Sequence, residues 1–148
     1  MLALIRPDSW NLPLFLHVLG AMILFGGAAT VAIVGFAART RTEHAALLAR
    51  VALRTCLFAV VPGWILMRAG AGWIVSKEFP HNTPGWVDVG FIVSEPGALI
   101  LIALSILAGV SVRRQGVGRA AVAVPVLAGI YLVALAIAWW AMSAKPGA

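Results

Sequence analysis

Charged residues are scarce in this chain. Only 11% of its 148 residues are Asp, Glu, Lys or Arg, whereas 62% are hydrophobic. A water-soluble domain of this length needs more polar surface than that. A lipid bilayer removes the requirement, because the outer faces of membrane-spanning helices contact hydrocarbon rather than water. The composition therefore predicts an all-α, polytopic membrane protein, with one transmembrane domain over residues 1–148.

Cysteine is almost absent, and familiar catalytic motifs are missing. Cys56 is the single cysteine, which excludes an internal disulfide and zinc sites built from several thiolates. The sequence contains no phosphate-binding glycine loop, no HExxH motif and no Ser-His-Asp arrangement, so it predicts neither a catalytic residue nor a metal site. The net charge of +6 lies in short clusters between apolar runs, which does not indicate nucleic-acid binding.

Four apolar runs stand out instead. We expect a four-helix transmembrane bundle, each helix near the roughly 20 residues that cross a bilayer, at about 11–38, 55–76, 87–112 and 120–142. The first run is too long for the apolar region of a signal peptide. Pro62, followed by Gly63, falls inside the second run and should kink that helix.

Arginine asymmetry predicts the orientation. The loops 39–54 and 113–119 hold seven arginines between them, whereas the loop 77–86 holds only Lys77, beside Glu78. The positive-inside rule places the arginine loops in the cytoplasm and both termini outside. We therefore expect a multi-pass protein of the cell membrane, of the bacterial inner-membrane kind. Five of the six tryptophans fall at the predicted outer ends, where indole favours the interface: Trp10, Trp73, Trp86, Trp139 and Trp140.

Three ionisable residues lie inside the predicted spans. His17, Arg68 and Glu95 each lie about 10–12 Å below the predicted outer ends of their helices. An unpaired charge in hydrocarbon costs several kcal/mol, so we expect Arg68 to pair with Glu95 in a buried polar cluster that faces His17. The stripe through Glu95 supports an interior position, because it also carries Ala98, Ile102, Ser105 and Gly109. In the alternative, Arg68 extends to the headgroups and Glu95 lies in a wet helix bend beside Pro96.

Histidine allows a cofactor hypothesis. Imidazole is a common haem ligand, and His17 and His81 both lie toward the predicted outer side. A His17–His81 axial pair for haem b is conceivable if the loop folds back over the bundle. The alternative makes His17 a hydrogen-bonding packing residue and His81 an exposed loop residue.

The start of the first helix carries a family resemblance. Phe15-Leu16-His17-Val18-Leu19-Gly20-Ala21, followed by Gly26-Gly27, resembles copper-resistance-D-like membrane proteins and a related group of small predicted integral membrane proteins without assigned function. The resemblance implies a four-helix bundle. In the copper-related relatives membrane histidines handle metal or haem, and only His17 matches such a position. The further histidines and methionines of a copper site are missing.

Three functions follow as hypotheses. The short loops and the large lipid-facing surface favour a non-catalytic accessory or anchoring subunit of a larger membrane complex, such as an electron-transfer complex. Its partners would be the bilayer and other membrane subunits, or further copies of the chain, with no nucleic acid. The second hypothesis is a haem- or metal-binding protein that uses His17. The third is a small transporter or proton-relay protein that uses His17, Arg68 and Glu95.

Overall fold

The computed structural model describes residues 8–78 and 84–144, and these residues form helices without any strand. Two short 3-10 helices, Asp8–Trp10 and Thr42–His44, precede the first and second spans. The longer helices are α1 (Asn11–Thr40), α2 (Ala45–Thr55), α3 (Val61–Glu78), α4 (Gly85–Arg113) and α5 (Arg119–Ala144). Four helical segments in this part of the chain are long and apolar enough to cross a membrane, which confirms the predicted number and order of long apolar helices.

The second of these segments is continuous but irregular. Between α2 and α3 the chain forms one π-helical stretch, Cys56–Val60, and the whole segment runs over Thr42–Glu78. Pro62 lies two residues beyond the end of this stretch and has no N–H to donate to the carbonyl of Phe58. We predicted a kink at Pro62, and the structure shows a π-helical stretch next to it, which interrupts the regular hydrogen-bond ladder of the helix.

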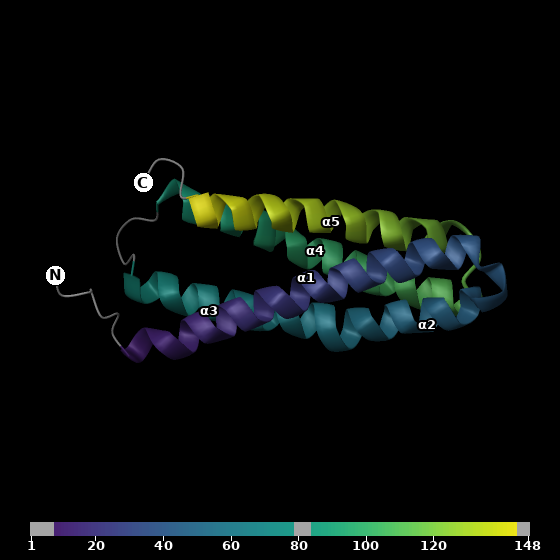
Figure 1. Ribbon diagram of the computed structural model, residues 1–148, viewed down its shortest axis with the longest axis horizontal. Helices are drawn as coiled ribbons and strands as arrows, with labels where there is room; N and C mark the ends of the chain where they lie inside the picture. The colour runs from purple at the N-terminus through teal and green to yellow at the C-terminus, as the bar shows by residue number, and fades with distance from the viewer. Residues whose placement is uncertain (1–7, 79–83, 145–148) are drawn as a thin grey trace.

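Helix α1 is the centre of the bundle. It packs most extensively against α3 and also against α5 and α2, whereas α3 and α4 meet at only a few positions. Figure 1 shows α1 beside α3 and α4 beside α5, and the two pairs diverge toward the end that carries both chain termini. The core between the helices consists of alanines and a few larger side chains, of which Leu24, Leu104 and Tyr131 are fully buried.

Glycine lets α1 and α3 approach to backbone contact. A Cβ atom on Gly63 would lie 2.7 Å from the backbone nitrogen of Leu24, and one on Gly70 would lie 2.5 Å from that of His17. A Cβ atom on Gly20 would overlap the backbone nitrogen of Met67. This contact gives α1 a packed face, on which Gly20 and Leu24 are buried together with Gly27 and Ala28.

Gly20→Ala should destabilise the bundle, because the added methyl group meets the backbone of α3 and cannot be relieved by turning a side chain. Overpacking of this kind costs about 1–3 kcal/mol, and unfolding in detergent micelles measures it. Gly26→Ala is the matched control on the same helix, because nothing lies within 4 Å of its added Cβ. It should leave stability unchanged or slightly raised, and equal losses in the two variants would contradict the close contact.

Candidate functional site

Arg68 on α3 and Glu95 on α4 form an ion pair. Glu95 Oε1 accepts hydrogen bonds from Arg68 Nη2 at 2.5 Å and from Arg68 Nε at 3.1 Å. The guanidinium carbon also lies 4.6 Å from the centre of the Phe91 ring, within cation–π range. The predicted pairing is thus confirmed, and Arg68 reaches across to α4 rather than outward to the headgroup level.

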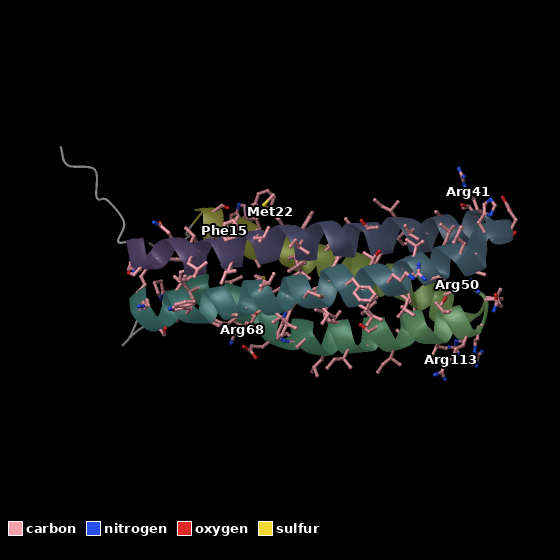
Figure 2. The ribbon with its side chains drawn as sticks, turned by 90° about the horizontal axis from the view of Figure 1, so that it is seen from below. Phe15, Met22, Arg41, Arg50, Arg68 and Arg113 are labelled. Carbon is pink, nitrogen blue, oxygen red and sulfur yellow. The ribbon has the colours of Figure 1, made fainter. Side chains whose placement is uncertain are left out.

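The location of this pair corrects our expectation of a buried cluster. The Glu95 side chain is 61% exposed and that of Arg68 is 30% exposed, and Figure 2 shows Arg68 on the outer side of the bundle. The reason lies in α4, which turns a different stripe inward. That buried stripe comprises Val87, Gly90, Ser94, Gly97, Leu101, Leu104, Ala108 and Ser111. The stripe through Glu95, which we expected to be interior, instead faces outward.

The surroundings of the pair are apolar. Ile92 and Leu99, about one turn before and after Glu95 on α4, are 69% and 68% exposed. The pair also lies inside the tryptophan level, because Arg68 is about 7.5 Å along α3 from Trp73 and Glu95 is about 14 Å along α4 from Trp86. A carboxylate with one arginine partner therefore opens onto an otherwise hydrophobic surface, within a helix long and apolar enough to cross a membrane.

A tryptophan makes a second bridge between α3 and α4. Trp64 Nε1 donates a hydrogen bond to the backbone carbonyl of Ser94 at 3.1 Å. Trp64 and Arg68 are four residues apart, so they leave α3 on the same face and reach neighbouring residues of α4. Trp64 is the one tryptophan outside the predicted interfacial belt, and this hydrogen bond gives its indole N–H a partner away from the helix ends.

His17 does not join the ion pair. Its Nδ1 lies 3.0 Å from the backbone carbonyl oxygen of Met67 on α3. A carbonyl only accepts, so Nδ1 carries the proton, and the bond ties α1 to α3. The one cluster of His17, Arg68 and Glu95 that we expected is therefore two separate sites. The partner of His17 belongs to the backbone of α3, so no pattern of side chains in the sequence predicts it.

The haem hypothesis remains a prediction. A hydrogen bond from Nδ1 to a backbone carbonyl is the arrangement that also orients ligand histidines, and the structure records no bond for Nε2 among the described residues. His81, the proposed second axial ligand, lies outside the described residues. Within residues 8–78 and 84–144 no three His, Cys, Asp or Glu residues gather to hold a metal ion. A visible absorption spectrum of the purified protein, compared with His17→Ala, tests the haem site directly.

Tyr131 is a polar residue that we did not predict. It is fully buried, and its hydroxyl is a buried side-chain polar atom without a hydrogen-bond partner in the described structure. The ring packs on Gly97, where an added Cβ would lie 2.6 Å from the hydroxyl oxygen. The sequence did carry a signal for a buried hydroxyl group, because Tyr131 is its single tyrosine and lies in the middle of an apolar run.

Comparison of the chain with family models, with curated proteins and with solved structures found no match. The resemblance carried by the first helix therefore stays a prediction, and the site is interpreted from its own geometry.

Removing one partner of the ion pair should cost more stability than removing both. Arg68→Leu strands a carboxylate at an apolar surface, and Glu95→Leu strands a guanidinium there, whereas the double variant strands neither. Contacting pairs couple by about 0.5–3 kcal/mol. We expect that coupling when the free energies of unfolding of the four proteins are compared in lipid nanodiscs.

Glu43→Gln is the matched control, because Glu43 lies on a short exposed helix and the side chain that it contacts is the exposed imidazole of His44 at 3.9 Å. It should change stability by no more than about 0.5 kcal/mol. Strictly additive effects of Arg68→Leu and Glu95→Leu would mean that the ion pair contributes nothing in lipid.

Proposed function

We propose that this chain is a multi-pass membrane protein that acts as a non-catalytic subunit of a larger membrane complex. The observation that carries the proposal is the Arg68–Glu95 pair, which opens onto an apolar surface instead of the bundle interior. The side that carries this pair, formed by Ile92, Glu95 and Leu99 of α4 with Arg68 of α3, is called the ion-pair face. We propose that another membrane protein covers it.

The physical argument concerns the Glu95 carboxylate. One Oε1 atom takes both bonds from Arg68, and the side chain is still 61% exposed. In hydrocarbon such a group is costly, and charged residues at membrane depth normally face other helices or water. A partner helix with a hydrogen-bond donor at this level would satisfy the remaining oxygen. It would also exclude lipid from Ile92 and Leu99, the exposed residues on either side.

We further propose that the arginine loops face the cytoplasm and that both termini lie outside. The arginines of residues 39–54, most of which belong to α2 in the structure, and of residues 113–119 support this orientation. A cysteine placed at Asn82 should react with a membrane-impermeant thiol reagent in intact cells, whereas one at Gln115 should react only after lysis. Cys56 is fully buried and should give little background. The reverse labelling pattern would invert the orientation.

A photo-crosslinker at Ile92 or Leu99 should capture one defined membrane-protein band in cells, because both side chains lie on the ion-pair face. The matched controls are Ile130 and Val133 on α5, which are exposed to a similar degree, 58% and 62%. They should capture lipid or a diffuse background. Immunoblotting and mass spectrometry identify the product. Equal capture from both helices, or from neither, would contradict a subunit interface at the ion-pair face.

A further inference from the structure

A groove on the outer side of α4 has no part in the proposed subunit interface. It has a volume of about 300 Å³ and is lined by Ser105, Ile106, Gly109, Val110 and Arg113. These residues span nine positions of one helix, or eight steps of 1.5 Å, so the groove runs about 12 Å along α4. We call it the α4 groove. Its centre lies about 20 Å along the helix from Glu95, so it does not depend on the ion pair.

The α4 groove has Ile106, Gly109 and Val110 along its length, which we call its floor together with Ser105, and it ends at Arg113, which we call its mouth. Nothing lies within 4 Å of a Cβ built on Gly109, so this glycine leaves open space. The Ser105 hydroxyl donates to the backbone carbonyl of Leu101 at 2.8 Å, which satisfies the one polar side chain of the floor. Arg113 is exposed at the end of α4. The groove therefore joins a cation at the helix end to apolar space at membrane depth.

No described carboxylate neutralises this mouth. Arg113 and Arg114 have no ion pair in the described structure, where the recorded pairs are Glu43 with His44 and Glu95 with Arg68. Glu43 is the only acidic residue in the arginine loops. No side chain of the described structure therefore competes with an anionic group from outside the chain for Arg113.

The helix end that carries Arg113 is held firmly. The backbone nitrogen of Gly116 donates to the carbonyl of Ser111 at 2.8 Å, and that of Arg114 donates to Val110 at 3.0 Å. Gly116 has φ +78°, and a Cβ there would lie 2.5 Å from the carbonyl oxygen of Ala45 at the start of α2. The turn is thus docked on α2, which fixes the backbone from which Arg113 projects. Figure 2 shows the Arg113 side chain extending from the outer side of α4.

We propose that the α4 groove binds an anionic phospholipid. Its phosphate would contact Arg113, whose guanidinium can bind phosphate in a bidentate manner, and one acyl chain would lie over Gly109 toward Ser105. The groove has its charge at the helix end and its apolar space toward the bilayer centre. The headgroup and acyl chain of a phospholipid lie in the same order. A partner helix fits less well, because it would follow α4 across about 30 Å, whereas the groove covers about 12 Å.

The test measures the melting temperature of the full chain in mild detergent with added phosphatidylglycerol, or with phosphatidylcholine of the same acyl chains. A ligand that binds only the folded state raises the melting temperature, and near saturation we expect a rise of roughly 5 °C with phosphatidylglycerol. Phosphatidylcholine should give less than half of that rise. Inorganic phosphate alone should give none, because it offers no acyl chain.

Two variants test separately how the shape of the α4 groove and the charge at its end contribute to lipid binding. Gly109→Leu fills the groove and keeps every arginine, whereas Arg113→Gln removes the charge and keeps the groove. Each should lose more than half of the rise caused by phosphatidylglycerol. Their matched controls are Gly129→Leu, another open helix position on α5, and Arg119→Gln, another exposed arginine at the same end. Both controls should retain the full rise.

Several outcomes would overturn the proposal. An equal rise in Gly109→Leu, Arg113→Gln and wild type would show diffuse attraction of anionic lipid to the arginine end. An equal rise with both lipids would show an apolar contact without headgroup recognition, and a full rise with inorganic phosphate would show a free-anion site. A change of oligomer size in Gly109→Leu with the lipid response intact would make the groove a protein interface. If Gly109→Leu does not fold, Gly109→Val and native mass spectrometry of the retained lipid take its place.

Discussion

Helices α1 and α3 pack in direct backbone contact, and the other helices of the bundle are arranged around that contact. Gly20 on α1 and Gly63 and Gly70 on α3 make it close, and the bond from His17 Nδ1 to the Met67 carbonyl fixes the register. Because Gly63, Met67 and Gly70 face α1, the residues next round the helix, Trp64 and Arg68, cannot point there as well. They extend toward α4 instead.

Polar side-chain contacts therefore hold α3 to α4, whereas close backbone packing holds α1 to α3. The two helices touch at few positions, and the recorded side-chain contacts between them are directional: the Trp64–Ser94 hydrogen bond, the Arg68–Glu95 pair and the Arg68–Phe91 stack. Interhelical bonds of this type stabilise membrane bundles only modestly. At the end where the α1–α3 and α4–α5 pairs diverge, these few side chains consequently join them. A partner protein or a change of charge can alter those contacts.

The sequence predicted the spans and the ion pair because both follow from rules that need no three-dimensional packing. Apolar run length predicts a span, and opposite charges at equal depth predict a pair. The inward face of α4 was mispredicted because that helix has two stripes with small residues, one through Gly90, Ser94 and Gly97 and one through Ser105 and Gly109. Hydropathy does not distinguish them. The choice depends on complementary shape, since Gly97 receives the Tyr131 ring. The His17 partner was unpredictable for a similar reason, because every residue has a backbone carbonyl.

The outer surface of the bundle differs from side to side, and this asymmetry bears on both proposals. Phe15 and Met22 on α1 are 60% and 69% exposed, and Figure 2 shows them on the side opposite Arg68 and Arg113. Apolar side chains of that kind are suited to contact with lipid tails alone. The α4 side instead carries an ion pair toward one end and a basic groove toward the other, and Glu95 and Arg113 lie about 27 Å apart along the helix. Lipid tails cannot satisfy the Glu95 carboxylate, and they do not reach the end of the helix that carries Arg113, so the two proposals give this side different polar partners. A protein donor suits Glu95, which lies inside the tryptophan level, and a lipid phosphate suits Arg113, which lies at the helix end where headgroups are found.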